Sequence, residues 1–99
     1  MAIAMQMEWP GITPEQYEEV RRRVDWEGNV PQGGIFHAAR FTDAGLSVGD
    51  VWESEADFNR FVEERLMPVV REVGIEGEPT VRFATLHTYF NAEAARVPA

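Results

Sequence analysis

The sequence predicts an α+β fold in which four strands and two helices follow one another in the order β-α-β-β-α-β. Three features predict this order. Four segments carry apolar residues in the alternation of half-buried strands, two segments carry them at helical spacing behind a capping box, and turns rich in glycine or proline separate them. Because each helix connects two strands and such connections are right-handed, we expect an antiparallel four-stranded sheet with both helices on one face.

The first strand and the first helix fill the N-terminal quarter of the chain. Residues 2–8 alternate tightly enough to form a strand, which Pro10 and Gly11 end. Thr13 then starts a helix, with Gln16 three residues later to complete a capping box. This helix is expected to stop near Trp26, before a long turn rich in glycine.

A hairpin is predicted in the middle of the chain. Residues 35–41 form its first strand, residues 46–53 form its second, and residues 42–45 make the tight reversal between them. Gly45 stands where a left-handed residue would close the turn.

The second helix begins at Ser54, with Asp57 completing another capping box, and its apolar stripe runs to Val73. Pro68 is expected to kink or break it, because proline lacks a backbone donor and clashes with the preceding turn. Residues 80–90 then read as one long final strand.

Composition bounds the class of protein. We expect one domain over residues 1–99, with residues 91–99 as a tail. The net charge is −8 and all nine basic residues are arginine, which argues against binding nucleic acid. There is no cysteine, no apolar run long enough to span a membrane, and no basic start typical of a signal peptide, so a cytoplasmic protein is expected.

The sheet is expected to need a cover on both faces, since both alternations along its strands carry apolar residues. A second copy of the sheet is the economical cover, and the sequence therefore predicts a homodimer. The residues behind this argument are Ile35, Ala39 and Phe41 against Phe36 and Ala38, and Phe83 and Tyr89 against Ala84, Leu86 and Phe90.

The strand-final segment Val51-Trp52-Glu53-Ser54, the apolar helix Phe58-Asn59-Arg60-Phe61 and the element order resemble the dimeric α/β-barrel superfamily, over roughly residues 1–90. This superfamily contains the antibiotic biosynthesis monooxygenases. The resemblance implies a ferredoxin-like dimeric α/β barrel, and it implies that Trp52 lines a pocket between the sheet and the helices. The superfamily's activities range from cofactor-free oxygenases of polycyclic aromatics to haem-degrading enzymes and isomerases.

Two positions depart from the patterns of that superfamily. The monooxygenases often have an asparagine four residues before the tryptophan, where this chain has Val48. The haem-degrading members have a histidine ligand about ten residues after it, where this chain has Val62. These departures argue against haem and against the best-known oxygenation chemistry, and no cofactor is predicted.

His37 is the candidate catalytic base, because histidine transfers protons near neutral pH. The hairpin leaves two registers open. With two central residues in the turn, His37 faces Asp50, which would orient the imidazole beside Trp52; with a bulge at Gly45, His37 faces Val51 instead. The structural alternative for His37, Asp50 and Trp52 is plain sheet and core packing.

Further candidates for substrate binding are His87, Tyr17 and Tyr89. His87 is placed in the final strand, which in such dimers would cross towards the partner and bring it near His37. Arg40 and Arg82 are other polar groups for a pocket rim, whereas Trp9 and Trp26 are expected to cap the ends of the core. The two histidines make no metal site, since no third ligand is placed by spacing.

The sequence supports three interpretations of function. The first is a homodimer that binds a small apolar or aromatic molecule and carries out cofactor-free acid/base chemistry, as an oxygenase or an isomerase. The second is a non-catalytic binding or accessory protein on the same scaffold. The third is a dimerisation module without a cavity. An open space around Trp52, as opposed to one filled by Phe58, Phe61 and Tyr17, would separate them.

Overall fold

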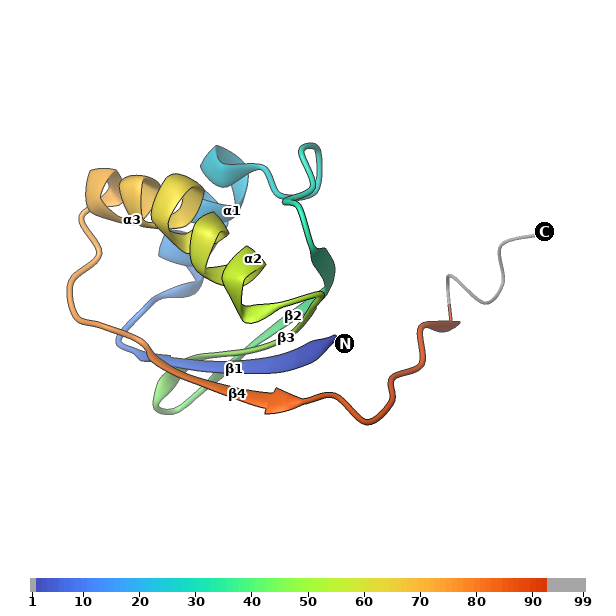
Figure 1. Cartoon of the computed structure of the whole chain (residues 1–99). Helices are drawn as coiled ribbons and strands as arrows, with labels where there is room; N and C mark the ends of the chain where they lie inside the picture. Colours follow the sequence, from blue (N-terminus) through green and yellow to red (C-terminus); the bar gives the residue numbers. More distant parts are fainter. Residues whose placement is uncertain (1, 93–99) are drawn as a thin grey trace.

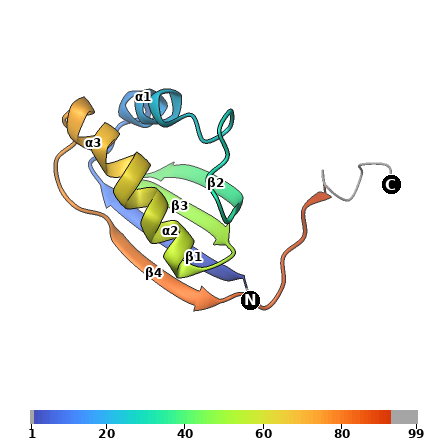
Figure 2. The same ribbon diagram turned by 45° about the horizontal axis from the view of Figure 1, so that its top comes forward.

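The computed structural model describes residues 2–92 of the 99-residue chain, and its elements follow the predicted order. Both helical regions cover the same face of one four-stranded sheet (Figures 1 and 2). The α+β, ferredoxin-like prediction is confirmed. The elements are β1 (Ile3–Pro10), α1 (Pro14–Val24), β2 (Gly34–Thr42), β3 (Gly45–Trp52), α2 (Glu55–Phe61), η1 (Val62–Leu66), α3 (Met67–Val73) and β4 (Thr80–Thr85).

The sheet has the order β2-β3-β1-β4, and every neighbouring pair is antiparallel. The two strands of the hairpin pair so that His37 lies opposite Asp50, with an irregularity between Gly34 and Phe36. The register is therefore the first of the two alternatives. It places the side chains of His37 and Asp50 on the same face of the sheet.

Helix α1 has the predicted start. The Thr13 hydroxyl accepts from the Gln16 amide at 3.1 Å, and the Gln16 side chain accepts from the Thr13 amide at 3.0 Å. The helix ends at Val24, where Asp25 takes the left-handed conformation with φ 54°. Arg65 donates to the Val24 carbonyl at 2.8 Å and so ties this end of α1 to the second helical region.

The second helical region is interrupted near Pro68, where a kink or break was predicted. Ser54 caps α2 by accepting from the Asp57 amide, and the chain passes through one π turn, η1, before α3 begins. The Met67 amide donates to the Val62 carbonyl, five residues back. Pro68 explains the wider turn, since it has no amide hydrogen to donate and its ring needs room next to the preceding turn.

Strand β4 is shorter than predicted. It ends at Thr85, whose pairing partner is Ile3, the first residue of β1. Beyond this point β1 has ended, and a hydrogen bond of 3.3 Å from the Leu86 amide to the Ala2 carbonyl extends the contact between the two backbones by one residue. Residues 86–92 leave the body of the protein in both views (Figures 1 and 2). Of the predicted tail, residues 93–99 lie outside the described residues.

The core lies between the sheet and the helices, and the other face of the sheet is uncovered. The buried apolar residues include Met5, Met7, Trp9, Val20, Leu46, Val48, Trp52, Phe58 and Val70. On the uncovered face Phe36 is 44% exposed, in keeping with the expectation that this face needs a cover. Among residues 2–92 no helix has the length and apolar character needed to cross a membrane.

Candidate functional site

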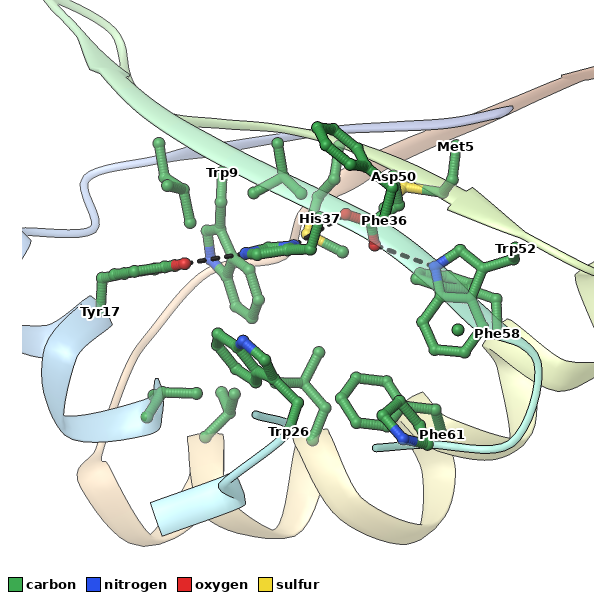
Figure 3. A pocket seen from close by; sticks show the side chains of 18 of the residues that line it. Met5, Trp9, Tyr17, Trp26, Phe36, His37, Asp50, Trp52, Phe58 and Phe61 are labelled. Atoms are coloured by element: carbon green, nitrogen blue, oxygen red, sulfur yellow. Dashed lines mark hydrogen bonds and ion pairs between the residues drawn. The ribbon is translucent and has the colours of Figure 1, made fainter. Parts of the chain in front are cut away.

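A cavity of about 260 Å³ lies between the covered face of the sheet and the helices. Its walls are mainly apolar and strongly aromatic (Figure 3). Its aromatic lining comprises Trp9, Tyr17, Trp26, Trp52, Phe58 and Phe61. Phe36, next to the irregularity in β2, borders both this cavity and the uncovered face of the sheet. Phe58 and Phe61 pack against Trp52 with ring centroids 5.5 and 5.4 Å away, yet they leave this space open.

Four side chains form a continuous hydrogen-bonded chain along the wall (Figure 3). The Trp52 indole N–H donates to Asp50 Oδ2 at 2.9 Å. Asp50 Oδ1 lies 2.7 Å from His37 Nδ1, and His37 Nε2 lies 2.8 Å from the Tyr17 hydroxyl. The chain thus runs from the end of β3, across the hairpin, to α1.

The local structure explains why these groups meet. Asp50 and Trp52 are two residues apart on β3 and share a face, and the hairpin register sets His37 opposite Asp50. Tyr17 comes from the first turn of α1, whose start is fixed by the capping box at Thr13. The structure thereby brings together the predicted site residues His37, Asp50, Trp52 and Tyr17.

The hydrogen bonds assign the proton on His37. A carboxylate has only acceptors, so Asp50, which is 8% exposed, accepts from both Trp52 and His37 Nδ1. In the neutral imidazole Nε2 is then the acceptor, and the Tyr17 hydroxyl donates to it. Asp50 therefore orients the ring and selects the tautomer that accepts a proton at Nε2.

Aromatic rings surround this polar chain. The Tyr17 and His37 rings are nearly parallel, with centroids 6.2 Å apart, and the Trp26 centroid lies 5.1 Å from that of His37. Burial raises the pKa of Tyr17 to about 12, and the nearby Arg21 guanidinium opposes that shift. Tyr17 is consequently a neutral hydroxyl at physiological pH.

Other predicted residues lie elsewhere. His87 and Tyr89 follow the end of β4, where they are exposed and line no part of this cavity. The placement of His87 inside a strand was wrong, because β1 gives residues beyond Thr85 no partner. Arg40 and Arg82 pair with Ser47 and Gln6 on the uncovered face, so they cannot form the rim of this pocket.

The two tryptophans expected at the ends of the core, Trp9 and Trp26, line the cavity instead. Trp9 is 3% exposed, in phase with Met5 and Met7 on β1, and this alternation could have revealed its position. Trp26 lies in the irregular connection after α1, where no helix or strand periodicity could have predicted which way its side chain faces. Within residues 2–92 there is no cluster of three or more histidine, cysteine or acidic side chains that could hold a metal ion.

Comparisons with known proteins agree on the fold. No protein-family model matches the chain, and a search of curated proteins finds no match. Among solved structures, SnoaB from Streptomyces nogalater, a cofactor-independent oxygenase, is similar with a TM-score of 0.58 and 14% identity over 89% of this chain and 93% of that chain.

Two further structures extend the agreement. A monooxygenase from the gene ActVA-Orf6 of Streptomyces coelicolor, in complex with Nanaomycin D, has a TM-score of 0.58 and 19% identity over 91% of this chain and 90% of that chain. A dimeric ferredoxin-like protein of unknown function from Thermobifida fusca has a TM-score of 0.60 and 13% identity over 87% and 92%. These likenesses confirm, at the level of the fold, the predicted resemblance to antibiotic biosynthesis monooxygenase-like proteins.

Proposed function

We propose that the protein binds a small, largely apolar or aromatic molecule in the cavity and removes a proton from it without a cofactor. One observation carries this proposal: His37 is held between the buried carboxylate of Asp50 and the Tyr17 hydroxyl, at the wall of an aromatic cavity. A general base needs both a fixed orientation and a partner that stabilises its protonated form, and Asp50 supplies both.

The chemistry follows from the proton's path. The substrate proton ends on His37 Nε2, the imidazolium pairs with Asp50, and the substrate becomes an anion delocalised over its ring system. Returning the proton to another carbon would give an isomerisation. Reaction of the anion with dioxygen as co-substrate would give an oxygenation. His37 is the base, Asp50 positions it, and Trp52 is both a wall of the cavity and a donor to Asp50.

The activities of two structurally similar proteins support the proposed chemistry. SnoaB is a cofactor-independent oxygenase, and the ActVA-Orf6 protein is a monooxygenase. In this chain Val48 is a buried, apolar part of the cavity wall, and the polar group on β3 comes two residues later, at Asp50. Because the polar side chain on this part of β3 is Asp50, the proposed base is His37, which Asp50 orients.

Exchange of a carbon-bound hydrogen tests the proposal without knowledge of the natural substrate. In D₂O, the protein should accelerate exchange of the acidic hydrogens of 2-tetralone, a two-ring ketone, by about 10²-fold or more, as followed by NMR. His37→Ala should abolish the acceleration, whereas His87→Ala, which removes the other histidine, should retain it. Exchange by His37→Ala at the wild-type rate would remove His37 from the mechanism.

The second candidate function is non-catalytic binding in the same cavity. It is favoured by one observation, that both ring nitrogens of His37 are already hydrogen-bonded. In that case, 2-tetralone should quench the fluorescence of the tryptophans that line the cavity, but exchange should stay at the solvent rate with every variant.

We further propose a homodimer formed through the uncovered face of the sheet. Its support is the exposed Phe36 on that face, the position of β4 at the edge of the sheet with Phe90 79% exposed beyond it, and the dimeric state of the Thermobifida fusca protein. Sedimentation equilibrium should give twice the mass of one chain.

A location in the cytoplasm stays a prediction, which fractionation of the producing cells would test.

A further inference from the structure

We infer that the ligand contacts Tyr17 directly, whereas His37 lies behind Tyr17 and does not contact the ligand. The ligand is an aromatic compound of one or two rings, and its hydroxyl group donates a hydrogen bond to the Tyr17 oxygen. This inference rests on the proposed function and specifies both the contact and the substrate class. It follows from the hydrogen-bonding capacity left over in the cavity and from the size of the cavity.

The polar atoms of the hydrogen-bonded chain are largely used already. The Trp52 N–H, both nitrogens of His37 and the Tyr17 O–H are each engaged in the chain, and His37 Nε2 is covered by the Tyr17 hydroxyl at 2.8 Å. A hydroxyl oxygen that donates its hydrogen still has acceptor capacity. The Asp50 oxygens each already accept one hydrogen bond, and this residue is only 8% exposed. The Tyr17 oxygen, at the outer end of the hydrogen-bonded chain, is therefore the more accessible acceptor, and a ligand must bring a donor to use it.

The same bond makes Tyr17 a relay. A ligand hydroxyl that donates to the Tyr17 oxygen can pass its proton there while the Tyr17 proton moves to His37 Nε2. The ligand becomes a phenolate, Tyr17 ends as a neutral hydroxyl that donates to it, and the positive imidazolium faces the carboxylate of Asp50. No electrons are transferred, and the charges balance. Because burial raises the pKa of Tyr17, the residue carries the proton onward and does not itself act as the base.

The cavity limits the number of rings. An apolar cavity of about 150 Å³ accommodates benzene. The cavity here is about 260 Å³. This volume suits one ring or two fused rings, and a third ring would exceed the space between the walls. The aromatic residues on those walls favour planar ligands.

The indole N–H of Trp9 is a second reason to expect an oxygen atom on the ligand. The indole N–H of Trp9 is buried and has no hydrogen-bond partner within the described part of the chain, and Trp9 lines the cavity. An unpartnered buried donor is destabilising. A ligand oxygen that accepts from Trp9 would satisfy it, in addition to the hydroxyl at Tyr17.

The chromogenic probe 4-nitrophenol tests the inference, since its phenol and phenolate forms absorb differently. At a pH one unit below the probe's own pKa, the wild-type protein should bind it with a clear phenolate band. It should bind 4-nitroanisole, which has no proton to donate, roughly fivefold more weakly. Tyr17→Phe, which keeps the ring, should abolish both the phenolate band and this preference, while Glu63→Gln on the exposed helix surface should change neither.

A second variant keeps the test informative if Tyr17→Phe folds poorly, which circular dichroism would reveal. In His37→Gln the side-chain oxygen can still accept from Tyr17 but cannot take up a proton. This variant should therefore retain the preference for nitrophenol and lose the phenolate band. For the ring limit, 2-naphthol should displace 4-nitrophenol, and the three-ring compound 2-hydroxyanthracene should fail to do so.

The outcomes separate this inference from the proposed function. A wild-type phenolate band in folded Tyr17→Phe would show that His37 meets the ligand directly, which overturns the relay and leaves the base in place. Tight binding of 2-hydroxyanthracene would overturn the size limit. If the protein binds neither nitrophenol nor 2-tetralone, the cavity is not a binding site and both proposals fall together.

Discussion

The two faces of the sheet are built from the same strands but carry different side chains. On the covered face, β1 and β3 present Met5, Met7, Trp9 and Trp52, and these large side chains meet the helices around a cavity. On the uncovered face, the small residues Ala4, Ala38, Gly49 and Ala84 occupy alternate positions, with the longer Arg40 and Arg82 beside them. Large, irregular side chains leave space between layers, whereas small ones let another sheet approach closely. The alternation along each strand therefore separates the face that holds the cavity from the face through which we propose association.

The largest expected contrast is between two aromatic deletions. Trp52→Ala should lower the free energy of unfolding by about 3–5 kcal/mol, because Trp52 is 4% exposed and also donates to Asp50. Phe36→Ala removes a residue that is 44% exposed on the uncovered face and should cost less than about 1 kcal/mol in the monomer. Urea denaturation at a concentration where both variants are monomeric measures the difference. Equal losses would show that the two faces contribute alike.

The next contrast concerns association. Gly49→Arg adds a long charged side chain to the uncovered face, where a Cβ atom at Gly49 meets nothing within 4 Å of the monomer. The monomer should keep its fold, while dimerisation should weaken at least tenfold, since two such charges would face a partner sheet. Sedimentation velocity measures the shift. Asn59→Arg adds the same charge on the exposed surface of α2 and should leave the dimer unchanged; dimers of equal strength in both variants would place the interface elsewhere.

The last contrast is a pH dependence confined to the covered face. The pKa of Tyr17 is about 12 in the folded protein and near 10.0 in an unfolded chain, so the folded state holds this proton more tightly. The resulting stabilisation is complete below pH 10 and is lost as the pH rises from 10 to 12. Over that interval the melting temperature of the wild type should fall more steeply than that of Tyr17→Phe. Parallel curves would mean that Tyr17 is solvated like an exposed tyrosine.

Much of the fold could be predicted because its signals are local. Thr13 and Gln16 mark the start of α1 by chemistry that operates over three residues, and the tight turn before Gly45 limits the hairpin to two registers. Within the site, the two-residue period predicted that Asp50 and Trp52 share a face, and one of the two registers added His37. Strand geometry alone therefore predicted, as one of two alternatives, that His37, Asp50 and Trp52 share a face.

What the sequence could not place depends on how separate elements pack. The bond from Tyr17 to His37 requires the rotation and height of α1 over the sheet, which no spacing along the chain encodes. Trp26 reaches the cavity from an irregular connection, and the volume of the cavity is what remains after all side chains have packed. The early end of β4 depends on where β1 begins, since a strand can continue only along a partner.

The π turn at Val62–Leu66 has a consequence for how the long helical region keeps in phase with the core. Phe58 and Val70 are both buried, and they lie twelve residues apart. At 3.6 residues per turn, that separation would rotate them about 120° away from each other in an unbroken α-helix. One π turn takes up about one extra residue, or roughly 100° of rotation, and so returns Val70 to within about 20° of Phe58. The helical region therefore behaves as an α-helix that has absorbed a one-residue insertion, with its angular error confined to a single turn and its apolar stripe continuous on both sides.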